Sequence, residues 1–159
     1  MVTGIDVSQT SIEKASKQFP WIRFIVGDLT KGNPFRPSTM SNEQSATNHD
    51  LSPLSLEPSA CSFDLVVIKE VLWYVCHNLK QFMQNVISMI KKDGFLYVSQ
   101  SFPESDKWVG QDVIDSPERL KEIMLRHLKP VHICTEVDWN YNGRPLIHFL
   151  GKMGECGDR

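Results

Sequence analysis

The segment Phe63–Ile68 constrains the fold of this 159-residue chain more than any other feature. Its residues are apolar except Asp64, and such a run is typical of a strand buried on both faces of a parallel sheet. Apolar residues at three- and four-residue spacing follow from Leu79 to Ile90, which predicts an amphipathic helix stopped by Gly94. A strand is predicted next, at Phe95–Val98. Strands that alternate with helices in this way indicate a parallel α/β sheet.

The same alternation precedes that segment. Residues 2–7 predict a short strand, and the helix after it carries Thr10 and Glu13 at the spacing of a capping box. Pro20 ends this helix, and Trp21–Val26 predicts a second strand. The first part of the chain therefore has the order strand, helix, strand.

The C-terminal part predicts one helix and a hairpin. Ser116 followed by Pro117 is a helix-start signal. The segments Val131–Trp139 and Pro145–Lys152 are predicted strands, joined through Asn142-Gly143, a pair that favours a tight hairpin turn. The expected fold class is therefore α/β, a Rossmann-like three-layer sandwich with a mostly parallel sheet and a C-terminal antiparallel hairpin.

Residues 33–62 differ from the rest of the chain. They hold seven serines, four prolines and no glycine, without a helical or strand period. We expect a long mobile loop inside one domain that spans residues 1–153, followed by a polar tail at 154–159.

Composition and charge exclude several classes of protein. The net charge is −2 without a basic block, so nucleic acid and anionic membranes are not expected partners. The longest apolar run, Val71–Cys76, is far shorter than the ~20 residues of a membrane span. The four cysteines and five histidines fit no metal-ligand spacing, so no metal is expected. Free thiols are consistent with a reducing cytoplasm, the expected location.

Acidic residues follow the predicted strands at the edge where α/β sheets bind ligands. Asp6 follows the first strand, Asp28 the second, and Lys69-Glu70 the third. One carboxylate there can accept hydrogen bonds from a ribose diol, and a second can accept from an adenine amino group. The alternatives are that Asp6 caps a helix and that Asp28 is a turn residue after Gly27.

Together these segments resemble the class I S-adenosylmethionine-dependent methyltransferases. The resemblance rests on Gly4–Ser8, Phe24–Asp28, Phe63–Val75, the turn Lys92-Asp93-Gly94 and the terminal hairpin. It implies a seven-stranded sheet with an antiparallel last strand and S-adenosyl-L-methionine as cofactor. Its cofactor-binding residues would be Asp6, Val7, Asp28, Leu29 and Lys69. Asp6 would bind the ribose and Asp28 the adenine amine, with Leu29 beside the ring and Lys69-Glu70 near the methionine moiety.

The chain departs from the family at its beginning. The family starts with a central strand and a glycine-rich turn, whereas none of the nine glycines here forms Gly-x-Gly. We therefore expect a domain truncated at its N-terminus, with its first strand missing and its cofactor binding impaired.

The predicted function is methyl transfer to a small-molecule acceptor. The candidate catalytic residues are Glu70, Tyr74 and His77, which come just after the third predicted strand. Alternatively, Tyr74 packs under the sheet end and His77 is a surface residue at a helix start. Because the sheet would have exposed edges, we expect that copies of the chain can pair along them as a homo-oligomer.

Two other functions stay open. One is a non-catalytic, methyltransferase-like binding or regulatory domain, which the missing turn favours. The other is a nicotinamide-dependent reductase, which in its short-chain form needs a Tyr-x-x-x-Lys pair. No tyrosine here has a lysine four residues later.

Overall fold

The computed structural model describes residues 1–35, 63–103, 109–138 and 143–154. Most of the predicted mobile loop at 33–62, from residue 36 onward, lies outside these ranges, as does the tail from residue 155.

The described elements follow the predicted alternation of strands and helices. In chain order they are β1 (Thr3–Asp6), α1 (Gln9–Gln18), β2 (Arg23–Val26), β3 (Phe63–Lys69), α2 (Leu72–Val75), the 3₁₀ turn η1 (Cys76–Asn78), α3 (Leu79–Ser88), β4 (Ile90–Ser101), α4 (Pro117–Leu125), β5 (Leu128–Asp138) and β6 (Arg144–Met153). None of the helices in the described ranges has the length and apolar stretch that a membrane crossing needs.

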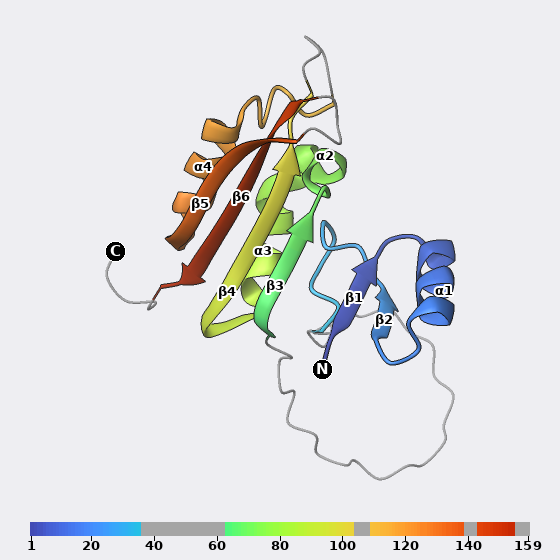
Figure 1. Cartoon of the computed structure of the whole chain (residues 1–159). Coiled ribbons are helices and arrows are strands. Elements are labelled where there is room, and N and C mark those ends of the chain that lie inside the picture. The colour runs from blue at the N-terminus through green and yellow to red at the C-terminus, as the bar shows by residue number, and fades with distance from the viewer. Residues whose placement is uncertain (36–62, 104–108, 139–142, 155–159) are drawn as a thin grey trace, which may run out of the picture.

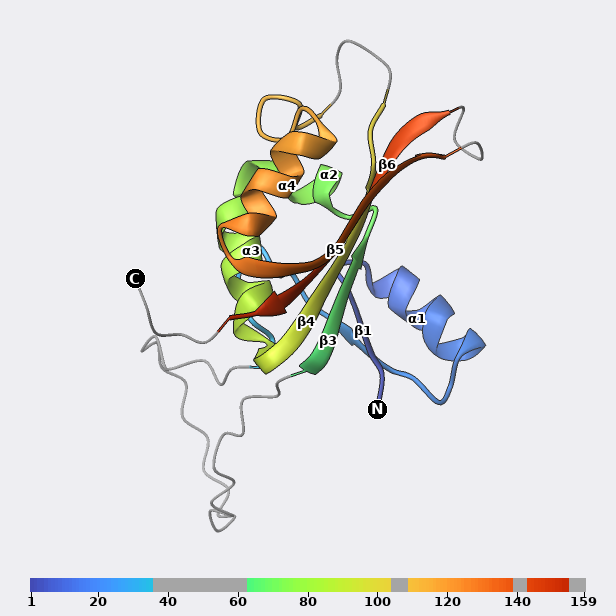
Figure 2. The same ribbon diagram turned by 60° about the vertical axis from the view of Figure 1, so that its left-hand side comes forward.

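The strands form two sheets in the described part of the chain. β1 pairs with β2 in parallel, and a second sheet has the order β3-β4-β6-β5. β3 and β4 are parallel, whereas β6 is antiparallel to both β4 and β5. Helices α2, α3 and α4 lie on one side of the larger sheet and α1 lies on the other side (Figures 1 and 2). The predicted Rossmann-like three-layer α/β fold with an antiparallel hairpin is confirmed.

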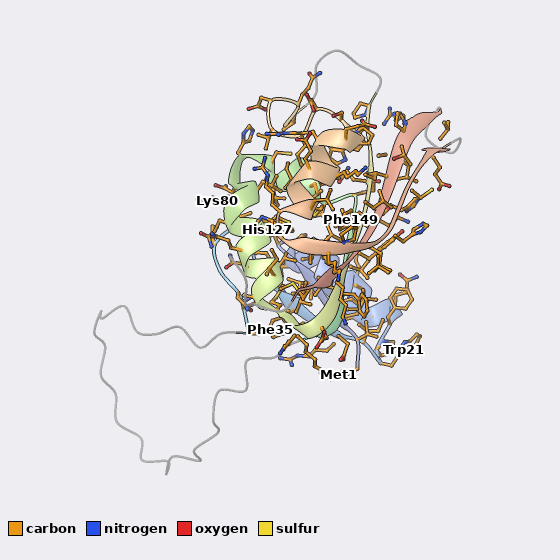
Figure 3. All side chains as sticks on the ribbon, turned by 90° about the vertical axis from the view of Figure 1, so that its left-hand side faces the viewer. Met1, Trp21, Phe35, Lys80, His127 and Phe149 are labelled. Carbon is orange, nitrogen blue, oxygen red and sulfur yellow. The ribbon has the colours of Figure 1, made fainter. Side chains whose placement is uncertain are left out.

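The core lies between the larger sheet and helices α2, α3 and α4. Leu96 and Val98 of β4 and Phe149 of β6 are fully buried against Val86 of α3 and Leu120 of α4. Figure 3 shows Phe149 in the middle of the packed side chains and Trp21 at their rim. Burial of this one sheet face explains the helical spacing of apolar residues that the sequence displays.

The N-terminal caps were only partly predicted. Ser116 caps α4 as expected, because its side chain accepts a hydrogen bond from Arg119 N. The predicted capping box of Thr10 and Glu13 is wrong. Ser8 is the N-cap of α1 and accepts from Ser11 N, so α1 begins one residue before Thr10.

The predicted end of the central helix is also wrong. α3 ends at Ser88, and Ile90 already pairs with Phe63 of β3. Gly94 lies within β4, where the pairing register with β3 shifts between Ile90 and Phe95 and Asp93 adopts a left-handed conformation with φ of 68°. Pairing and burial of Ile90 outweigh its position at the end of an apolar helical pattern.

β3 is not buried on both faces, contrary to the prediction from its apolar run. Ile68 is 4% exposed on the helix side, but Leu65 and Val67 are 50% and 57% exposed. The reason is that α2, α3 and α4 all lie on one face of the larger sheet (Figure 2). The apolar residues of the other face have no helix above them within the described ranges.

Replacement of a residue on the buried sheet face should destabilise the protein much more than replacement of a residue on the exposed face. Phe149→Ala should lower the free energy of unfolding by about 3–5 kcal/mol, because it removes a fully buried ring and leaves a cavity. Val131→Ala on β5, where the side chain is 55% exposed, should change it by less than about 0.5 kcal/mol. Urea unfolding of both variants measures the difference, and equal losses would contradict this placement of the core.

Candidate functional site

The predicted site residues lie at the carboxyl ends of the parallel strands. The arrowheads of β1, β3 and β4 point to the same end of the molecule (Figure 1). Asp6 ends β1, Asp28 follows β2, Lys69 ends β3 and Glu70 follows it. Because parallel strands finish at one edge, the fold brings the ends that carry these residues to one side of the domain.

The Asp6 carboxylate has one hydrogen bond in the described structure. Its Oδ1 accepts from Ser8 N at 2.7 Å, and the side chain is exposed. The alternative that Asp6 caps the helix is wrong, because Ser8 has that role. Asp6 therefore shapes the turn between β1 and α1 while presenting Oδ2 at the strand end. Val7, beside it, is 67% exposed.

Asp28 is engaged in its own turn, as the alternative interpretation expected. Its Oδ1 accepts from Thr30 N at 3.0 Å and from Thr30 Oγ1 at 2.6 Å, and Oδ2 is 3.2 Å from Lys31 Nζ. The hydrogen bonds from Thr30, followed by the Lys31 charge, hold the pKa of the Asp28 carboxyl below its usual value. Leu29 packs against the core, and its carbonyl oxygen accepts from Asn85 Nδ2.

Glu70 ties the end of β3 to the end of β4. Its Oε1 accepts from Ser101 N at 2.8 Å. Its Oε2 accepts from Ser101 Oγ at 2.8 Å, from Gln100 Nε2 at 3.1 Å and from Trp73 Nε1 at 3.3 Å. Glu70 also has a φ of 54°, which is uncommon for a residue other than glycine. The four accepted bonds hold this strained turn in place, so the carboxylate has a structural role at the strand end.

Helix α2 and turn η1 follow Glu70 in the chain and carry the other two candidate catalytic residues. Tyr74 is 86% exposed, so the alternative that it packs under the sheet is wrong. His77 is exposed in η1, as its surface interpretation expected. Trp73 instead packs edge-on against Phe102, with ring centroids 5.8 Å apart. Tyr74 and His77 are therefore accessible to a ligand, and Lys69 is also exposed.

An apolar slot separates the two sheets. It has a volume of about 640 Å³ and is walled by residues 1–5 on one side and 63–68 on the other. Leu29, Val71, Phe82, Val86 and Met89 complete its lining. We call this cavity the β1–β3 slot. It lies between strands that carry Asp6 and Glu70 at their ends, so it borders the candidate site.

One element of this site escaped the sequence analysis. Gln100 donates to Glu70 and accepts from Leu72 N at 3.2 Å, which joins β4 to the start of α2. The signal was present, because Ser99, Gln100 and Ser101 are consecutive polar residues directly after the apolar stretch Phe95–Val98 of the predicted strand. All three are buried, and buried polar groups require partners.

A three-layer α/β domain with carboxylates at its strand ends belongs to the broad class that binds nucleotide-like cofactors. A comparison with protein families narrows this class. Residues 1–98, more than half of the chain, match the family described as "Methyltransferase domain". The chain therefore belongs to the methyltransferase domain family, and its resemblance to the class I S-adenosylmethionine-dependent methyltransferases is confirmed. S-adenosyl-L-methionine is the cofactor of that class.

Solved structures show the same fold at low sequence identity. The N-methyltransferase NodS from Bradyrhizobium japonicum, in complex with S-adenosyl-L-homocysteine, is 18% identical with a TM-score of 0.63. A TehB-like S-adenosylmethionine-dependent methyltransferase from Corynebacterium glutamicum is 19% identical with a TM-score of 0.56. The [4+2]-cyclase SpnF is 11% identical with a TM-score of 0.61.

Each of these comparisons covers 96% of this chain, but only 66%, 68% and 66% of the respective neighbour. The chain thus spans about two thirds of the length of these neighbours. A comparison with curated proteins gives no match.

Removal of the Glu70 carboxylate should destabilise the strand ends. Glu70→Ala leaves the Ser101 and Gln100 donors without their acceptor, and the left-handed backbone strain remains. We expect the free energy of unfolding to fall by about 1.5–3 kcal/mol, the scale of hydrogen bonds to a charged group. Urea denaturation followed by circular dichroism measures this change.

Glu122→Ala is the matched control. Glu122 is exposed on α4 and pairs with Arg119 across one helical turn, so its loss should cost less than about 0.5 kcal/mol. Equal stability of Glu70→Ala and the control would show that the Glu70 network contributes nothing to the fold.

Proposed function

We propose that this domain binds S-adenosyl-L-methionine at the carboxyl ends of β1, β2 and β3 and transfers its methyl group to a small-molecule acceptor. The observation that carries the proposal is the Asp6 carboxylate. It is exposed at the end of β1 with Oδ1 engaged by Ser8 N, and Oδ2 is left for a ligand. A carboxylate in that position suits a ribose diol, which needs an acceptor beyond the strand end.

The other adenosine contacts are weaker in this chain. Asp28 is the residue that the family resemblance pairs with the adenine amine, but its oxygens already interact with Thr30 and Lys31. Leu29 would supply apolar contact to the ring from the edge of the core, and Val7 would do so from the residue after β1. The sequence also has no Gly-x-Gly turn to approach the methionine half. We therefore propose that this chain alone binds the cofactor weakly and that its activity is impaired.

The acceptor side of the proposed site is α2 and η1. When bound, the cofactor supplies an electrophilic methyl group. Tyr74 and His77 are the candidates to remove a proton from the acceptor, because both are exposed beside the end of β3. Glu70 would act as a positioning residue that holds α2 against β4, and Lys69 would face the carboxylate of the methionine moiety. NodS, a structural neighbour, is an N-methyltransferase, which makes amines the first acceptors to test.

A second candidate function is a non-catalytic binding domain. The saturated Glu70 carboxylate favours it, because four accepted hydrogen bonds leave little capacity for proton transfer. Such a domain would bind S-adenosyl-L-homocysteine but methylate none of a panel of amines, phenols and carboxylic acids. Methyl transfer to one of them by the purified chain would exclude it.

Asp6→Asn tests the proposed ribose contact. The replacement should weaken binding of S-adenosyl-L-homocysteine by about 1.5–3 kcal/mol, because a charged acceptor is lost. The amide oxygen can still accept from Ser8 N, so the turn and the thermal stability should be unchanged. Calorimetric titration of both proteins at millimolar ligand measures the affinities.

Asp64→Asn is the control for charge. Asp64 is exposed near the opposite end of β3, where it pairs with Lys91 at 2.8 Å. Its replacement should leave the affinity unchanged. If both variants weaken binding equally, or if Asp6→Asn has no effect, Asp6 is not the ribose ligand.

A further inference from the structure

Three side chains on neighbouring strands of the larger sheet form a hydrogen-bonded series outside the candidate cofactor site. The Tyr97 hydroxyl oxygen on β4 is 2.7 Å from Nδ1 of His148 on β6. His148 Nε2 is 2.9 Å from Oε1 of Glu136 on β5. We call these residues the Tyr97–His148–Glu136 triad. The proposed methyl transfer uses none of the three.

The register of the sheet explains how the triad assembles. Tyr97 lies opposite Leu150 of β6, and Glu136 lies opposite Leu146 of the same strand. His148 stands between these two leucines, so it is the diagonal neighbour of both Tyr97 and Glu136 on one sheet face. That face is turned away from α2, α3 and α4, because successive residues of a strand alternate between the two faces (Figure 2).

Both ring nitrogens of His148 are engaged, and the chemistry of their partners fixes their roles. An ionised carboxylate only accepts hydrogen bonds, so Nε2 of the neutral imidazole carries the proton and donates to Glu136. Nδ1 is then the acceptor for the Tyr97 hydroxyl. The two rings stack with an interplanar angle of 20° and centroids 6.1 Å apart, which limits rotation of the phenol away from Nδ1.

This order of groups is that of a nucleophile, a general base and an orienting carboxylate. Both distances fall in the range of about 2.6–3.2 Å that proton transfer between such groups needs. A carboxylate on the far nitrogen holds the imidazole in the required tautomer and stabilises the imidazolium that forms when Nδ1 takes a proton. The side chains of His148 and Glu136 are 23% and 57% exposed, so water reaches the triad.

The surroundings of the Tyr97 phenol indicate which substrate it would take. Leu150 of β6 lies opposite Tyr97 on one side, and Val67 of β3 lies opposite it on the other. Val67 is 57% exposed, so apolar surface beside the phenol is open to a ligand. An apolar acyl group matches this surface.

We propose that the Tyr97–His148–Glu136 triad is an acyl-transfer site that takes neutral carboxylic esters with an apolar acyl group. Tyr97 Oη forms a bond to the ester carbonyl carbon while the bond from that carbon to the alcohol oxygen breaks. The Tyr97 proton passes to His148 Nδ1 and from there to the departing alcohol oxygen. Water then attacks the acyl-tyrosine, and His148 Nδ1 takes a proton from this water and returns it to the Tyr97 oxygen. The net reaction converts ester and water into acid and alcohol, with Glu136 as a positioning residue.

Acylation by p-nitrophenyl butyrate tests this proposal in the unaltered protein. Mass spectrometry of peptides locates the butyryl group and measures its rate of addition at each tyrosine. Tyr74 is the internal comparison, because it is 86% exposed and has no hydrogen bond to a histidine in the described structure. Exposure alone would make Tyr74 react faster. With general-base assistance, Tyr97 should react at least about tenfold faster than Tyr74.

Two variants separate proton transfer from hydrogen bonding. In His148→Gln, the amide oxygen can accept from the Tyr97 hydroxyl but cannot take its proton, so acylation of Tyr97 should fall to the rate of Tyr74 or below. Glu136→Gln keeps an acceptor for Nε2 but removes the charge that stabilises the imidazolium, so it should slow acylation by a smaller factor.

His132→Gln is the matched control. His132 is exposed on β5 and lies opposite Leu150, so this change removes an imidazole from the same sheet face and leaves the triad intact. Acylation of Tyr97 should be unchanged. Circular dichroism checks that all three variants fold.

Three results would overturn the proposal. Acylation of Tyr74 at the same rate as Tyr97, or faster, would show that exposure alone governs reactivity. Unchanged acylation of Tyr97 in His148→Gln would show that the imidazole is not its base. Unchanged acylation in Glu136→Gln would show that the carboxylate only links two strands. None of these measurements uses S-adenosyl-L-methionine, so the proposal can fail independently of the proposed function.

Discussion

Burial of one face of the β3-β4-β6-β5 sheet under α2, α3 and α4 is the constraint on which the rest of the structure depends. Leu96, Val98 and Phe149 are inaccessible to solvent on that face. Their packing holds β3 and β4 parallel and fixes where both strands end. The turn at Glu70 can therefore adopt a left-handed conformation, because the sheet on one side and α2 on the other leave it no freedom to relax.

The acidic residues at the strand ends differ in how fully neighbouring donors engage their carboxylates. Asp28 and Glu70 satisfy nearby donors and stabilise turns, whereas Asp6 accepts a hydrogen bond at Oδ1 alone in the described structure. The distinction arises from the neighbours of each residue: Thr30 follows Asp28 in its turn, and Ser101 reaches Glu70 across the sheet. A carboxylate that is saturated by local donors is a poor acceptor for a ribose or a reacting proton, whatever its place in the family pattern.

Sequence patterns predicted much of this fold because most of its elements carry local signals. Ser116 and Pro117 mark the start of α4, and the hairpin of β5 and β6 follows from two strand patterns around Asn142-Gly143. Two features were not predicted because they depend on tertiary contacts. The spacing of Ile90 suits a helix, but its pairing with Phe63 places it in β4. The Gln100 contacts depend on residues about 30 positions away, which no local pattern encodes.

The sequence by itself determined the α/β class, the order of strands and helices, and the placement of acidic residues after the strands, because periodicity and turn chemistry act over a few residues. Only the tertiary structure decided that Glu70 is engaged by donors of β4 and which face of β3 is covered. It also decided that β1 and β3 face each other across an apolar slot. These properties depend on which distant segments pack together. Exposure of Leu65 and Val67 follows from the absence of a helix over them in the described structure, although their own sequence is that of a buried strand.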